Sequence, residues 1–280
     1  MLRLLLNRYH SGGEGYALLK ALPEEESKKI SSISIESGNI YPALEEFKAF
    51  PNVHYSWLID SLEKIKKEKL ALILALFPEE IALKLQNVLG SHPKPVQLTS
   101  LGKTFFRTQL YRHLSIEGAL PLDYIPETSL SFLARVKKVK LIDIIDFLAL
   151  YDLAEEIQHI VDKHLLEQIY ACFSQKKQFF LKKCLHQKEK LVTQRLRLEH
   201  WDGDATKLKK ILHHKGIVRL GYALSGEHKD LIWHIMHILD SGRGEKLSRY
   251  CNKEAIPGVT EALRKQIFTI VKFFKQMSAK

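Results

Sequence analysis

The stretch GIVRLGYALSGEHKDLIWHIMHILDSGRGEKLSRYC, residues 216–251, decides the fold class of this chain. Apolar residues recur in it at helical spacing on both sides of a small pair, Ser225–Gly226. The first stripe contains Leu220, Ala223 and Leu224, and the second contains Leu231, Ile232, Ile235, Ile238 and Leu239. A second interruption is predicted at Ser241–Gly242–Arg243. The pattern predicts a helical hairpin with Leu224, Leu231, Ile235 and Ile238 in its core.

Helical periodicity extends over most of the rest of the chain. It is clear in residues 57–89, 130–150, 153–173, 176–199, 206–224, 229–239 and 259–276. Start signals agree with it: Pro78 precedes two glutamates, and Asp204 is a candidate N-cap. The alternating stretch at 30–37 is short and has no partner of similar strength. The sequence therefore predicts an all-α fold.

Three segments share one pattern, in which an apolar helix is followed by a short interruption and then by a second apolar helix. They are residues 70–89, 141–161 and 220–239. A helix pair cannot bury its apolar faces alone, so this pattern predicts stacked helical hairpins in an armadillo-like superhelix with two lobes. Residues 91–104, with two prolines and no periodicity, are the predicted linker. They separate an N-terminal lobe, 1–90, from a C-terminal helical-repeat domain, 105–280.

The positive charge of the chain is concentrated in its second half. The net charge is +11, and residues 175–197 alone contain eight Lys or Arg against one Glu. This segment predicts a basic helix that faces phosphates or an acidic protein. The aromatic pair Phe179 and Phe180 would stack on bases if the partner is a nucleic acid. The alternative is a solvated face of an amphipathic helix, with lysine stems covering the apolar stripe.

No catalytic or metal-binding pattern emerges from the sequence. His234 and His237 are three residues apart, but no second helical pair completes a metal site. The three cysteines are scattered, which favours a reducing cytoplasm over a disulfide framework. No phosphate-binding loop or nucleophile elbow is present. We therefore expect a protein without enzymatic activity, cofactor or metal. The chain has neither a signal-peptide core nor an apolar run of the roughly 18 residues that a membrane helix needs.

The opening stretch resembles the C-terminal domain of the flagellar motor-switch protein FliG family. The family pattern L-x-x-A-L-x-G is matched by Leu220, Ala223, Leu224 and Gly226. An amphipathic helix, the S-x-R pair Ser241 and Arg243, and a closing helix then follow, so that the likeness covers about residues 200–276. Residues 70–85 are similar to the start of the family's middle domain.

Two departures limit this resemblance. The Glu-His-Pro-Gln motif of the family's middle domain is replaced by residues 65–68, which read IKKE. The charged Asp-Asp-Arg run of the family's torque ridge falls on Asp204, Ala205 and Thr206, so only one acid is kept. Since that ridge works through its charges, the likeness argues for a switch-like component more than for a torque generator.

The resemblance implies a structural adaptor in a flagellar or type III secretion basal body. The N-terminal lobe would bind the cytoplasmic tail of a membrane-ring protein, and the C-terminal lobe a cytoplasmic-ring or stalk protein. A cytoplasmic location is expected, with peripheral attachment at the inner membrane as one form of it. The alternative function is a basic helical-repeat protein that binds nucleic acid. The expected contact residues are Asp204, Lys207, Lys209 and Lys210 on the ridge, and Lys176, Lys177, Lys182 and Lys183 on the basic helix.

Overall fold

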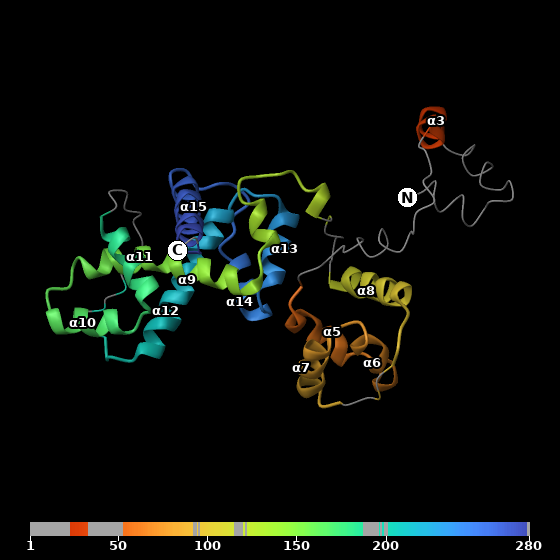
Figure 1. Ribbon diagram of the computed structural model, residues 1–280, viewed down its shortest axis with the longest axis horizontal. Helices are drawn as coiled ribbons and strands as arrows, with labels where there is room; N and C mark the ends of the chain where they lie inside the picture. Colours follow the sequence, from red (N-terminus) through yellow and green to blue (C-terminus); the bar gives the residue numbers. More distant parts are fainter. Residues whose placement is uncertain are drawn as a thin grey trace. The chain divides into compact units, whose positions relative to one another are not determined.

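The computed structural model describes residues 23–32, 53–91, 94, 96–114, 120, 122–186, 196, 198 and 201–278 of the chain (Figure 1). All regular secondary structure in these residues is helical, and no strand occurs among them. The prediction of an all-α fold is confirmed for this part of the chain. The alternating stretch at 30–37 begins inside helix α3 (Glu24–Ser32), and residues 33–37 lie outside the described residues.

Contacts between residues divide the chain into two compact units. One contains Met1–Ala49 and Lys66–His113, and the other contains Phe50–Ile65 and Leu114–Lys280. Helix α8 (Ser100–Leu114) begins inside the predicted linker. Residues 100–104 therefore form the first turn of α8.

The unit that contains Lys66–His113 includes the helices α6 (Lys67–Leu74), α7 (Glu79–Leu89) and α8. Pro78 is the N-cap residue of α7, and Gly90 ends that helix with a φ of 58°. The predicted interruption of the segment 70–89 is therefore present. Arg107 on α8 donates from Nη2 to the carbonyl oxygen of Leu76 at 2.5 Å, which ties α8 to the turn before α7.

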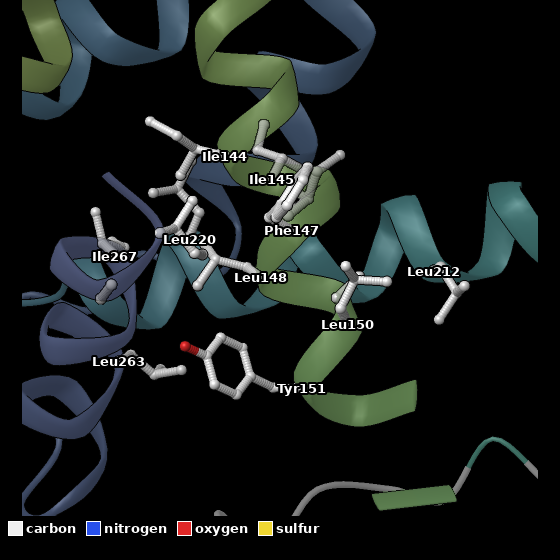
Figure 2. Packing of buried hydrophobic residues seen from close by; sticks show 14 of the residues in the cluster. Ile144, Ile145, Phe147, Leu148, Leu150, Tyr151, Leu212, Leu220, Leu263 and Ile267 are labelled. Carbon is white, nitrogen blue, oxygen red and sulfur yellow. The ribbon is translucent and has the colours of Figure 1, made fainter. Parts of the chain in front are cut away.

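The other unit is built around helix α9 (Lys138–Ile157). Its other helices are η1 (Tyr55–Leu58), α5 (Ile59–Glu63), η2 (Leu122–Tyr124), η3 (Ser131–Arg135), α10 (Lys163–Ala171), α11 (Gln175–Leu185), α12 (Ala205–Leu224), α13 (Lys229–Ile238), α14 (Ser241–Ser248) and α15 (Val259–Ser278). Helix α9 packs against α11, α12 and α15. Figure 2 shows Leu148 of α9 in one apolar cluster with Leu220 of α12 and Ile267 of α15.

The hairpin predicted from residues 216–251 is present. Leu224, Leu231, Ile235 and Ile238 are all buried, as expected. Gly226 has a φ of 78°, a region that glycine enters without steric cost, and its N–H donates to the carbonyl of Asn252. The second interruption was misplaced: Ser241–Arg243 form the first turn of α14, since Asp240 caps that helix by accepting from the Arg243 N–H.

Two predicted helix boundaries in the middle of the chain are wrong. Residues 141–157 form part of one continuous helix, and the break comes only before Asp162, the N-cap of α10. The basic helix predicted to reach residue 199 ends at Leu185. Further along, the backbone N–H groups of Leu196 and Leu198 donate to the buried carboxylate of Glu156, at 3.0 and 3.1 Å, instead of to helix carbonyls. Residues 187–195 lie outside the described residues.

Candidate functional site

A groove of about 730 Å³ lies among helices α9, α11, α12 and α14. Its lining residues are Ile142, Asp146, Leu150, Phe173, Lys177, Thr206, Lys209, Lys210, Leu212, His213, His214, Ile217, Asp240, Gly242, Arg243 and Lys246. Five of these side chains are Lys or Arg, and two are acidic. We refer to this feature as the basic groove.

Asp146 on α9 joins two walls of the basic groove. Its carboxylate accepts from Lys177 Nζ of α11 at 2.8 Å and from His213 Nδ1 of α12 at 2.7 Å. Burial alone would raise the pKa of Asp146, but the hydrogen bonds and charges of His213 and Lys177 together hold this pKa below its ordinary value. Asp146 is thus an ionised anchor that fixes one basic side chain and one imidazole.

Arg243 on α14 continues this network on the opposite side of the imidazole. Arg243 Nε donates to His213 Nε2 at 2.8 Å, and Arg243 also pairs with Asp240. Because a guanidinium only donates, His213 accepts at Nε2 and donates from Nδ1 to Asp146. Both ring nitrogens of His213 form hydrogen bonds, so this residue of α12 connects α9 to α14.

Asp240 closes the network at the start of α14. Burial would raise its pKa, but Arg243 and Lys138 outweigh that effect and hold the pKa of Asp240 below its ordinary value. Lys138 Nζ lies 3.4 Å from the Asp240 carboxylate and 2.8 Å from His54 Nε2. The charges of Lys177 and Arg243 are therefore largely balanced within the protein.

The remaining cations of the basic groove are not balanced in this way. Lys209, Lys210 and Lys246 are exposed, and none of them has an ion-pair partner among the described residues. The pKa of His214 is lowered, first by burial and then by the nearby charges of Lys246 and Lys215. The groove therefore presents three lysine ammonium groups to solvent beside a neutral imidazole.

The basic groove also has apolar walls. Ile142 and Leu150 come from α9, Leu212 and Ile217 from α12, and Phe173 from the turn before α11. A groove lined by both apolar and cationic side chains suits a ligand that is itself amphipathic, with apolar side chains on one side and acidic side chains beside them.

The structure brings some of the predicted contact residues together and separates others. Lys177, Lys209 and Lys210, predicted on two different segments, line the same groove. Asp204 caps α12 by accepting from the N–H groups of Thr206 and Lys207, and Lys207 Nζ pairs with Asp202 at 2.8 Å.

The other predicted lysines, on α11, lie outside the basic groove. Lys176 and Lys183 lie over phenylalanine rings, and Lys182 is exposed. The charged and histidine lining residues that the sequence did not predict are Asp146, His213, His214, Asp240, Arg243 and Lys246. Their only signals were the adjacent histidines and the Ser-x-Arg pair, and neither indicated a groove.

The base-stacking role considered for the basic helix does not fit the positions of its two aromatic residues. Phe180 is 1% exposed and belongs to the apolar core. Phe179 is half exposed, but its ring stacks on Phe273 with 6.0 Å between the ring centroids. The two rings were predicted as a pair because they are adjacent, yet adjacent helical residues point in directions about 100° apart.

The two histidines with metal-like spacing bond to the backbone instead. His234 Nε2 donates to the carbonyl of Leu120, and His237 Nδ1 donates to that of Trp233, each at 2.8 Å. Within the part of the chain that the structure describes, no group of three or more His, Cys, Asp or Glu is arranged to hold a metal ion. The helices of that same part include none that is both long and apolar enough to cross a bilayer.

Comparisons of this chain with protein-family models, with curated proteins and with solved structures gave no match.

Proposed function

We propose that the protein is a non-enzymatic adaptor that binds an acidic, amphipathic segment of a partner protein in the basic groove. The observation that carries this proposal is the set of three lysines, Lys209, Lys210 and Lys246, in a groove that is also lined by apolar residues. Acidic side chains of the partner would pair with these ammonium groups, and its apolar side chains would contact the apolar lining residues.

The rigidity of the groove supports a binding role. The network through Asp146, His213 and Arg243 joins α9, α11, α12 and α14 by hydrogen bonds of 2.7 to 2.8 Å. A partner that binds to such walls orders few protein side chains on association, which lowers the entropic cost of binding. The unpaired lysines would add electrostatic attraction that speeds association and is weakened by salt.

The wider biological setting of this adaptor rests on the resemblance to the FliG family alone. It would place the protein in a flagellar or type III secretion basal body, between a membrane-ring tail and a cytoplasmic-ring or stalk protein. Attachment to the cytoplasmic side of the inner membrane through these partners belongs to the same proposal. An armadillo-like stacking of helical hairpins belongs to the proposal as well, without residues 141–157, which lie in the continuous helix α9.

The groove assignment is tested with a charge-reversal variant, Lys209→Glu/Lys210→Glu/Lys246→Glu. A control variant, Lys182→Glu/Lys253→Glu/Lys265→Glu, changes three exposed lysines that do not line the groove and alters the net charge equally. The probe is a fluorescent helical peptide with leucines on one face and glutamates on the other. Anisotropy is measured in low and physiological salt.

We expect the wild type and the control to bind the peptide, and the groove variant to bind at least about tenfold more weakly. A scrambled peptide of the same composition should bind weakly to all three proteins. Equal losses in both variants, or equal binding of the scrambled peptide, would refute the groove as the binding site.

For the adaptor itself, affinity purification in mild detergent should recover basal-body proteins with the wild type and lose them with the groove variant. Recovery of nucleic acid alone would overturn the proposal.

A further inference from the structure

A second basic surface lies where α11 and the C-terminal half of α15 meet the start of α9. Three lysine ammonium groups lie over phenylalanine rings there. Lys176 Nζ is 4.3 Å from the ring centroid of Phe274, Lys140 Nζ is 5.7 Å from the same centroid, and Lys183 Nζ is 5.0 Å from that of Phe179. We call this surface, made by Lys140, Lys176, Lys183, Phe179 and Phe274, the lysine–phenylalanine face.

The rings under these lysines form one connected cluster. Phe274 packs edge-on against Phe147 at 4.8 Å, and Phe179 stacks on Phe273, which in turn contacts Phe147 at 5.9 Å. Cation–π attraction holds each ammonium group near its ring while leaving its N–H donors directed to solvent. The lysines are thus partly ordered before any ligand arrives.

The charge of this face is not neutralised by neighbouring carboxylates. Lys140, Lys176 and Lys183 have no ion-pair partner among the residues that the structure describes. Residues 168–188 and 262–280, which include α11 and most of α15, contain no Asp or Glu. Along α9, the acidic residue nearest in sequence to Lys140 is Asp143. Asp143 follows Lys140 by three residues and so lies on the same side of α9, but three lysines against one aspartate leave this face with an excess of positive charge.

Exposed apolar side chains accompany these lysines. Phe179 is 50% exposed, and Met277, one turn beyond Phe274, is 39% exposed. Lysines beside exposed aromatic and aliphatic side chains are typical of protein surfaces that bind the interface of an anionic bilayer.

We propose that the lysine–phenylalanine face binds the surface of an anionic phospholipid bilayer. The three ammonium groups pair with lipid phosphates and carboxylates, and Phe179 and Met277 enter the boundary between headgroups and acyl chains. Single-stranded nucleic acid fits less well, because Phe179 already stacks on Phe273 and Phe180 is buried. None of the five residues of this face lines the basic groove, so this proposal is independent of the proposed function.

The test is flotation of the full chain with vesicles of phosphatidylcholine alone or of phosphatidylcholine with phosphatidylserine. The variant Lys176→Glu/Lys183→Glu removes two of the cations, and Lys209→Glu/Lys210→Glu is the matched control in the basic groove. A second variant, Lys176→Gln/Lys183→Gln, removes the charges without adding acids. Far-ultraviolet circular dichroism checks that each variant keeps its helices.

The wild type should bind the phosphatidylserine vesicles and not the neutral ones. Since each lysine at an anionic surface contributes about a fivefold factor, the Gln variant should lose more than about tenfold in partition coefficient, and the Glu variant still more. The groove control should stay within about threefold of the wild type. Phe179→Ser should weaken binding even in high salt, because its contribution is apolar. Equal binding to neutral and anionic vesicles would overturn the proposal, and so would equal losses of vesicle binding in the face and groove variants. It would also be overturned if the face variants lost a gel shift of single-stranded RNA but kept vesicle binding.

Discussion

Arg219 is a buried charged residue in the unit that contains the basic groove. It is 3% exposed, and its guanidinium donates to both carboxylate oxygens of Asp152 at 2.8 Å and to Gln266 Oε1 at 2.9 Å. These bonds connect α12 to α9 and α15 at the centre of the core. A bidentate buried pair of this kind satisfies its own charges, but it leaves a costly unpaired charge when one partner is removed.

Asp152→Ala should therefore lower the free energy of unfolding by about 3–5 kcal/mol. Urea denaturation followed by tryptophan fluorescence measures this loss. Trp57, Trp201 and Trp233, the three tryptophans of the chain, all belong to the unit that contains Arg219. The double variant Asp152→Leu/Arg219→Met removes both charges and should lose clearly less stability than the single variant. A single variant as stable as the wild type would show that the buried pair contributes nothing.

At the scale of elements, the fold depends on how closely α12 approaches α9. Gly216 lies in the middle of α12, where glycine is unfavourable for a helix. A Cβ atom at this position would lie 2.0 Å from the carbonyl oxygen of Ile145 on α9. The absence of a side chain thus allows two helix backbones to touch, and this contact also sets the distance between two walls of the basic groove.

Gly216→Ala should destabilise the protein by about 1–3 kcal/mol, even though alanine is the better helix former, because the two helices must move apart. Gly242→Ala is the matched control. Gly242 is in the first turn of α14, and the nearest atom to its added Cβ is 3.8 Å away, so that substitution should be neutral or stabilise by up to about 1 kcal/mol. Thermal unfolding of both variants decides the question. If the two substitutions shift the transition equally, close approach of the helices does not explain Gly216.

At the scale of the whole molecule, a segment from the N-terminal part of the chain completes the C-terminal core. Trp57 on η1 donates from Nε1 to the carbonyl of Leu239, 182 residues further along, at 2.8 Å. Its ring lies 4.3 Å from that of His237, whose other neighbour is Trp233 at 3.9 Å. Burial between these rings lowers the pKa of His237 to about 4, so this imidazole is neutral at physiological pH. Because the segment around Trp57 packs against residues of the C-terminal part, residues 66–113 are an insertion between two parts of one compact unit.

Trp57→Ala should lower the stability of that unit by about 2 kcal/mol or more, because it removes a large ring and leaves the Leu239 carbonyl without its donor. Trp57→Phe keeps a ring against His237 and should lose less. Circular dichroism at a helical wavelength is the suitable measurement, since the substitution itself changes the fluorescence. An unchanged transition in the alanine variant would mean that the segment around Trp57 does not stabilise the core.

Local patterns in the sequence were sufficient where the structure depends on neighbours a few residues apart. The helical class, the break at Gly226 and the N-cap role of Asp204 were all predicted, because each follows from spacing, backbone freedom or a side chain bonding to N–H groups two and three residues ahead. The burial of Ile235 and its stripe followed from the period of 3.6 residues in the same way.

Only the tertiary structure decided the features that depend on residues far apart in the chain. The carboxylate of Asp152 on α9 is buried in the core, where Arg219, 67 residues later, donates to it. Lys177 and Lys210 come to line one groove because α11 and α12 both pack on α9. The helical period shows which side of a helix is apolar, but the partner of each charged residue is set by packing between helices, and a single sequence does not specify that packing.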